Sequence, residues 1–136
     1  MNINRLFITA GAIFLFALLW NGFVHLVILA DANSALATIT RPAAERSLGL
    51  SLFITAALAL LFVWSFARFA RQGNMKEGLL LGIFFALLAG ILADLNQYVM
   101  YPIPASLAAK WFGFGLIEFC GYGVLAAWLY PTKART

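Results

Sequence analysis

The chain alternates between four long apolar runs and shorter polar segments. The runs cover residues 6–30, 48–67, 79–100 and 107–130. Each reaches the roughly 20 residues that a helix needs to cross about 30 Å of hydrocarbon. Lipid offers no hydrogen-bond partners, so the backbone of such a run must form its hydrogen bonds internally, as a helix does. The pattern therefore predicts four transmembrane helices.

Residues at the ends of the runs set the expected bounds, which are helices over about 6–30, 42–71, 77–100 and 107–130. Pro42 and Glu45 favour an early start of the second helix, because proline suits a first turn and a carboxylate stabilises the helix dipole there. The polar segment 71–74 forms a short turn, which makes its neighbouring helices antiparallel. We expect an all-α, antiparallel four-helix transmembrane bundle, with residues 1–136 as a single domain.

Composition agrees with a membrane protein. The chain is 64% hydrophobic and 10% charged, with a mean hydropathy of +0.94, whereas soluble domains carry about 25% charged residues. The first run is longer than the roughly 7–15 apolar residues of a signal peptide, so we expect a true spanning helix. The single Cys120 cannot form an internal disulfide.

The basic residues predict the orientation. Six fall on one side of the expected bundle and three on the other: Arg5, Arg68, Arg71, Lys76, Lys133 and Arg135 against Arg41, Arg46 and Lys110. Basic residues accumulate on the cytoplasmic side of membrane proteins. We therefore expect cytoplasmic N- and C-termini in a bacterial-type inner membrane. Trp111, Tyr98 and Tyr101 fall near the opposite interface, where aromatic belts occur. Because the basic residues lie in connections and tails and form no patch, we expect the lipid bilayer as partner and no nucleic acid.

The third run carries a row of small residues at steps of four. The row ends in a carboxylate and reads Gly78, Gly82, Ala86, Gly90 and Asp94. Small residues let two helix backbones approach closely in lipid, and Gly113 offers a second small-residue surface on the fourth helix. Contact between these surfaces would bring Asp94 near Glu118, where two carboxyl groups would share a proton or bind a cation. The row fits packing within one bundle, or association as a homo-oligomer or in a larger membrane complex.

Three ionisable residues lie inside the apolar runs, namely His25, Asp94 and Glu118. They lie about 8, 9 and 16 Å from the outer, non-cytoplasmic ends of their helices at 1.5 Å per residue. Ionisable groups in a membrane face the bundle interior, so we expect these three to converge. Asn21 is one turn before His25, and Gln97 follows Asp94, so both are expected to support the site.

The polar residues fit four functions. They could join helices by hydrogen bonds, bind or conduct a proton or cation, bind a small ligand, or catalyse a reaction with His25 as base. Zinc, iron or manganese would accept one imidazole and two carboxylates, but no local motif supports this, so the metal and any cofactor stay unidentified. We favour a non-enzymatic ion or ligand site with a role in transport. The alternative is a non-catalytic accessory or assembly subunit.

A faint repeat links the two halves of the chain. Residues 13–19 resemble residues 83–88, and aligning Phe16 with Phe85 sets His25 opposite Asp94. Chance is the simpler explanation, because phenylalanine, alanine and leucine dominate both segments.

Overall fold

Four long helices make up most of the chain. The structure is a computed structural model that describes residues 1–130 apart from the side chain of Ala43, and these residues form helices and no strand. The long helices are α1 (Ile3–Phe23), α3 (Leu48–Phe69), α4 (Met75–Ala89) and α6 (Ala105–Leu129). Shorter elements are α2 (Ala30–Ser34), α5 (Asn96–Met100) and the 3₁₀ turn η2 (Ala43–Glu45).

Two stretches of π-helix continue α1 and α4. They are η1 (Val24–Ile28) and η3 (Gly90–Leu95), and η3 leads directly into α5. With these included, four segments are long and apolar enough to cross a membrane: Ile3–Ile28, Leu48–Phe69, Met75–Met100 and Ala105–Leu129. The described chain is therefore all-helical, with the four apolar helices of a small membrane protein.

Side-chain caps fix where three of the long helices begin. Asn2, Ser47 and Asn74 each accept a hydrogen bond from the backbone N–H three residues later, at 3.0, 3.2 and 3.0 Å. Such caps satisfy donors that the first helical turn leaves without a partner. The predicted start of the second helix at Pro42 is thus too early. Pro42 precedes only the short turn η2, and α3 begins at Leu48 behind its Ser47 cap.

Glu77 holds the turn between α3 and α4. Its carboxylate accepts hydrogen bonds from the backbone N–H groups of Arg71, Gln72 and Gly73 at 3.1, 3.0 and 2.7 Å. Gly73 has a φ of 65°, a conformation that glycine adopts without strain. The short polar turn predicted for residues 71–74 is therefore present, tied together by the first turn of α4.

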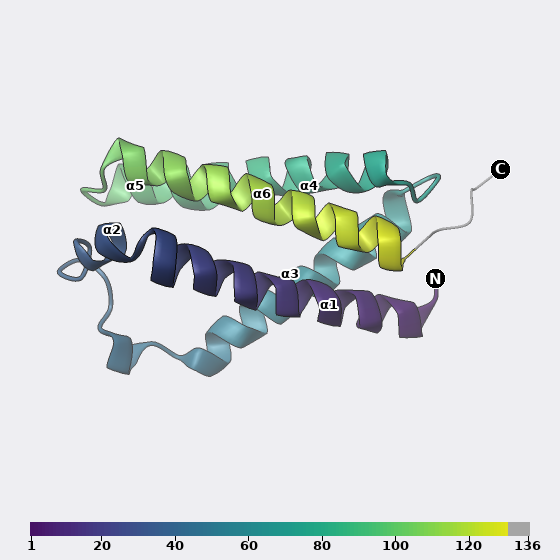
Figure 1. Cartoon of the computed structure of the whole chain (residues 1–136), viewed down its shortest axis with the longest axis horizontal. Coiled ribbons are helices and arrows are strands. Elements are labelled where there is room, and N and C mark those ends of the chain that lie inside the picture. The colour runs from purple at the N-terminus through teal and green to yellow at the C-terminus, as the bar shows by residue number, and fades with distance from the viewer. Residues whose placement is uncertain (131–136) are drawn as a thin grey trace.

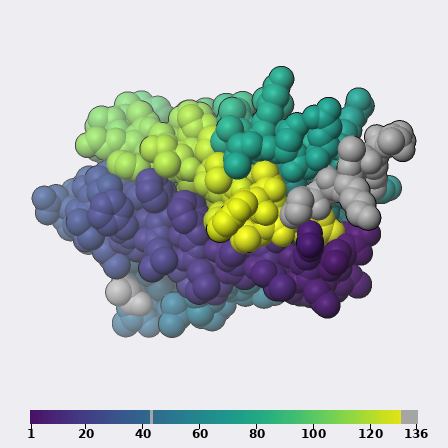
Figure 2. Space-filling model, turned by 45° about the vertical axis from the view of Figure 1, so that its right-hand side comes forward, coloured from purple at the N-terminus to yellow at the C-terminus, as the bar shows by residue number. Residues whose placement is uncertain are grey.

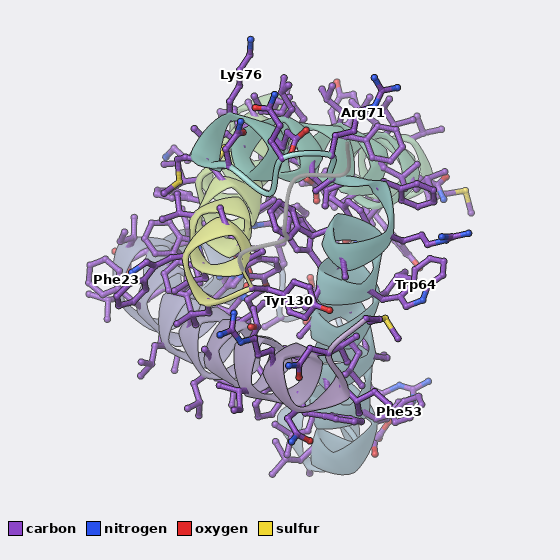
Figure 3. The ribbon with its side chains drawn as sticks, turned by 90° about the vertical axis from the view of Figure 1, so that its right-hand side faces the viewer. Phe23, Phe53, Trp64, Arg71, Lys76 and Tyr130 are labelled. Carbon is purple, nitrogen blue, oxygen red and sulfur yellow. The ribbon has the colours of Figure 1, made fainter. Side chains whose placement is uncertain are left out.

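The helices pack unequally. The α4–α6 pair has the most extensive contact, while α1 packs on α3 and α6. Figure 2 shows α6 (yellow) lying between α1 (purple) and α4 (teal). α3 crosses behind α1 at an angle (Figure 1), so its first half diverges from the other helices. Seen along the long axis, Phe53 and Trp64 of α3 project outward (Figure 3), with exposed fractions of 67% and 43%.

Glycines allow the close approach of α4 to α6. A Cβ on Gly78 would collide with the backbone of Gly123, its carbonyl carbon standing 2.9 Å away, and one on Gly82 would stand 2.9 Å from the carbonyl carbon of Phe119. Gly90 lies against the ring of Phe112. Ala86, which lies between Gly82 and Gly90 along α4, is buried. Gly113 plays no such part, because a Cβ there would meet no atom within 4 Å. The small-residue surface of α6 is centred on Gly123, two turns or more from the expected position.

An aromatic cluster joins all four long helices. Ring centroids of Phe62 in α3 lie 5.0 Å from Phe85 in α4 and 5.6 Å from Tyr122 in α6, and Tyr122 lies 6.1 Å from Phe16 in α1. A second apolar cluster lies at the end of the molecule that carries α2: Val24, Leu29, Leu36, Ile103 and Leu107. Val24 of this second cluster also lines the cavity described next.

Candidate functional site

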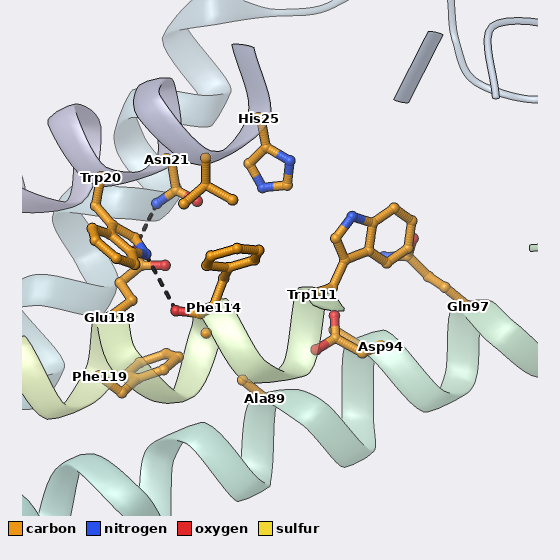
Figure 4. Close-up of a pocket in the computed structure, with 13 residues that line it drawn as sticks. Trp20, Asn21, His25, Ala89, Asp94, Gln97, Trp111, Phe114, Glu118 and Phe119 are labelled. Carbon is orange, nitrogen blue, oxygen red and sulfur yellow. Dashed lines mark hydrogen bonds between the residues drawn. The ribbon is translucent and has the colours of Figure 1, made fainter. Parts of the chain in front are cut away.

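A cavity of about 320 Å³ opens between α1, α6 and the η3–α5 segment. Its polar lining consists of all five side chains predicted for the site, namely Asn21, His25, Asp94, Gln97 and Glu118. We refer to this space as the polar cavity (Figure 4). α3 contributes no lining residue, and neither does any lysine or arginine.

Glu118 is tied to two neighbouring side chains. Asn21 Nδ2 of α1 donates a hydrogen bond to Glu118 Oε1 at 2.7 Å, and the Tyr122 hydroxyl donates to the same oxygen. Asn21 Nδ2 also donates to the carbonyl of Ala17 at 2.9 Å, which fixes the amide on its own helix. Glu118 therefore links α1 to α6.

Asp94 is half-buried and lines the polar cavity without a partner. Its carboxyl group makes no hydrogen bond or ion pair with any other residue of the described part, 1–130. Asp94 also lines a smaller cavity of about 210 Å³ beside Ala108. Of the two acidic residues of the site, Asp94 makes no hydrogen bond among the described residues, whereas Glu118 is engaged through Oε1.

Asp94 and Glu118 do not form the expected carboxyl pair within the described residues. Gly90 packs on Phe112, so Asp94, one turn further, is level with Ala108. Glu118 then lies roughly 15 Å further along α6 at 1.5 Å per residue. From the sequence, the predicted depths of Asp94 and Glu118 differ by only about 7 Å. That smaller difference arises because each depth is counted from the end of its own apolar run and not from the contact between the two helices. The 112–114 segment of α6 lies between the two carboxyl groups.

His25 reaches the cavity from η1 and is held by Asn33. The Asn33 amide nitrogen lies 3.2 Å from His25 Nδ1 and 3.2 Å from the His25 carbonyl oxygen. A carbonyl oxygen only accepts, so this nitrogen is a donor and Nδ1 accepts from it. The neutral imidazole therefore carries its proton on Nε2.

No group of three or more His, Cys, Asp or Glu side chains within residues 1–130 is placed to hold a metal ion. The metal alternative of one imidazole and two carboxylates is not formed there, because Glu118 is bonded to Asn21 and Tyr122 while His25 is bonded to Asn33.

The aromatic walls of the cavity were not predicted from the sequence. Four rings contribute to the lining, namely those of Trp20, Trp111, Phe114 and Phe119. Trp111 was assigned to an interfacial belt, yet its indole nitrogen is buried and has no hydrogen-bond partner among the described residues. Residues 111, 114, 115 and 118 recur at helical spacing, so a search for one face of α6 would have grouped them.

Both unexpected π-helical stretches lie at the cavity. His25 belongs to η1, and Asp94 belongs to η3. A π turn adds a residue to a helix and so rotates the side chains that follow, and such turns are frequent at functional sites.

Comparison with protein-family models, curated proteins and solved structures finds no match to this chain.

Proposed function

We propose that this protein is an integral membrane protein that binds a cation in the polar cavity, with the carboxylate of Asp94 as counter-ion. The observation that carries the proposal is the lack of any partner for Asp94 among residues 1–130. An unpaired charge on a membrane helix costs free energy, up to about 2.5–3.5 kcal/mol at the centre of the helix. A bound cation would offset this cost, which no described side chain does.

The charges that line the cavity also favour a positively charged ligand. It contains two carboxyl groups and one imidazole, and no lysine or arginine. A cavity lined by acidic groups and walled by apolar side chains concentrates cations. His25, Asn21 and Gln97 complete the proposed site as polar neighbours.

In this proposal, the protein spans the bilayer as one antiparallel four-helix domain. Contacts between α4 and α6 support this, because successive residues of α4 meet earlier residues of α6: Gly78 meets Gly123, Gly82 meets Phe119 and Gly90 meets Phe112. More basic residues lie on the side of the termini than on the opposite side, which supports cytoplasmic termini in a bacterial-type inner membrane. Two of those basic residues, Lys133 and Arg135, lie outside the described residues.

A second candidate function has its own support. Glu118 is engaged with Asn21 and Tyr122, as expected of a residue that joins helices. An accessory or assembly subunit of a membrane complex would need such a link and no ligand. Asp94 separates the two candidates, because a purely structural carboxyl group in a membrane needs a hydrogen-bond partner.

The test measures thermal unfolding of the protein in mild detergent at equal ionic strength with sodium, potassium, magnesium or benzyltrimethylammonium chloride. We expect at least one cation to raise the Tm of the wild type and to have no such effect on Asp94→Asn. A cation at 100 times its Kd stabilises the folded state by about 2.7 kcal/mol. Asp31→Asn is the matched control, because it removes the same charge from an exposed residue outside the cavity. If no cation stabilises the wild type, or if Asp94→Asn responds equally, the accessory function is favoured.

A further inference from the structure

We propose that the cation of this site is organic: an ammonium group that pairs with Asp94 while its hydrocarbon substituents pack on Trp111 and Phe114. This inference rests on the proposed function and names the chemical class of its ligand. It follows from the lining of the polar cavity.

An inorganic cation would find too few oxygen ligands here. Calcium takes six to eight oxygen ligands and magnesium six in octahedral geometry. Asp94 is level with Ala108, and the backbone of Glu118 lies roughly 15 Å further along α6 at 1.5 Å per residue. Glu118 is also already engaged with Asn21 and Tyr122. No three acidic, histidine or cysteine side chains of residues 1–130 are placed around one ion. Water would have to supply most of the coordination.

An organic cation needs the groups that are present. A quaternary ammonium is attracted to the faces of aromatic rings, most strongly to tryptophan, and needs only one counter-charge. In the close-up, Asp94 lies below the ring of Trp111, and the ring of Phe114 lies to the left of Trp111 (Figure 4); all three side chains line the cavity. Apolar side chains form another part of the wall, among them Val24, Ala89 and Ala93. Such a wall suits hydrocarbon substituents.

Cavity size also limits the ligand. A volume of about 320 Å³ lies at the lower end of the roughly 300–1,000 Å³ of small-molecule pockets. It suits an ammonium ion with one ring or a short alkyl chain.

The experiment titrates benzyltrimethylammonium into the detergent-solubilised protein by calorimetry. This probe carries a permanent charge and no transferable proton, so its binding reports attraction to the site and not proton transfer. We expect saturable binding that weakens at least about tenfold in Asp94→Asn and about tenfold in Trp111→Leu, the size expected for a partly desolvated cation–π contact. Trp128→Leu is the matched control, because Trp128 is on the same helix and 72% exposed. Its Kd should equal that of the wild type.

The outcomes separate this inference from the proposed function. Stabilisation by sodium, potassium or magnesium that needs Asp94, without binding of benzyltrimethylammonium, would keep the cation site and overturn its organic ligand. Equal binding by Trp111→Leu and the wild type would overturn the aromatic contact. If Trp111→Leu does not give a monodisperse protein, Trp111→Phe replaces it. This variant keeps a ring with a weaker cation–π attraction, and a Kd unchanged from the wild type would then count against the inference. Failure of every cation in the Asp94 test would overturn both proposals.

Discussion

At the scale of single residues, the two half-buried carboxyl groups differ in their surroundings. Glu118 accepts hydrogen bonds from Asn21 on another helix and from Tyr122 on its own helix, whereas Asp94 has no partner among residues 1–130. Both residue types carry the same charge in solution, so the sequence alone assigns them equal roles. Their partners suggest a structural role for Glu118 and a ligand-binding role for Asp94.

The structural role of Glu118 predicts how its variants behave. Glu118→Gln keeps a carbonyl oxygen that accepts both hydrogen bonds, so we expect its free energy of unfolding to stay close to that of the wild type. Glu118→Leu leaves the Asn21 amide and the Tyr122 hydroxyl without their acceptor, which should cost about 1–3 kcal/mol. Chemical denaturation in mild detergent measures both values. A leucine variant as stable as the wild type would mean that this link between α1 and α6 contributes nothing.

The sequence was informative about which polar residues share a location and uninformative about their bonds. All five predicted side chains line one cavity, because polar groups in membrane helices turn away from lipid. Their function as a binding site stays a prediction. The link from Tyr122 to Glu118 could have been predicted from the spacing of four residues on one helix. The contact between Asn33 and His25 could not, because it depends on how the chain turns after η1.

At the scale of helices, the closest contact in the molecule is between α4 and α6. Gly78 faces Gly123 and Gly82 faces Phe119 so closely that neither glycine has space for a side chain. The row of small residues in the third apolar run predicted such an approach. Its partner surface was misplaced at Gly113, because several glycines in α6 share similar spacing and only the register between the helices distinguishes them.

A pair of glycine variants tests this contact. Gly82→Ala places a methyl group 2.9 Å from the Phe119 carbonyl carbon, so the helices must separate. We expect its free energy of unfolding to fall by about 1–3 kcal/mol, as in other overpacked cores. Gly113→Ala is the matched control, since its methyl group meets no atom within 4 Å. There alanine should be neutral or stabilising by up to about 1 kcal/mol, because it favours helix over glycine. Equal effects at both positions would contradict the observed register.

Helix existence was easier to predict than helix detail. Apolar length identified the four long segments, but it could not detect η1 and η3, since one extra residue in a turn leaves the composition unchanged. The early helix start predicted at Pro42 is wrong, because Ser47, directly before the apolar run, caps the helix there. A serine in that position is a standard signal for a helix start.

At the scale of the whole molecule, the two halves of the described chain share an order of elements. Each half has a long helix that continues into a π-helical stretch and a short helix, and then a loop and an uninterrupted long helix. His25 lies in the π stretch of the first half and Asp94 in that of the second. The faint sequence repeat aligned these same two residues. The halves differ in packing, since α4 contacts α6 far more extensively than α1 contacts α3.

The orientation of the molecule gives the last prediction. Asn2 donates its backbone N–H to the Tyr130 hydroxyl at 2.9 Å, so the start of α1 and the end of α6 lie at one end. The α3–α4 turn with Arg71 and Lys76 is expected on the same side of the membrane, and α2 on the other. Excess positive charge stays in the cytoplasm during insertion, which predicts that residue 72 is cytoplasmic and residue 34 is external.

Cysteine labelling measures this orientation directly. In a Cys120→Ser background, Ser34→Cys should react with an impermeant maleimide in intact cells, whereas Gln72→Cys should react only after the cells are permeabilised. Both positions are exposed and uncharged, so the substitutions leave the balance of basic residues unchanged. The reverse pattern would invert the proposed orientation and bring the Asp94 end of the cavity to the cytoplasmic side. A ligand would then reach Asp94 from inside the cell. Labelling of both positions in intact cells would contradict the proposed antiparallel spans, because residues 34 and 72 are separated by one crossing, that of α3.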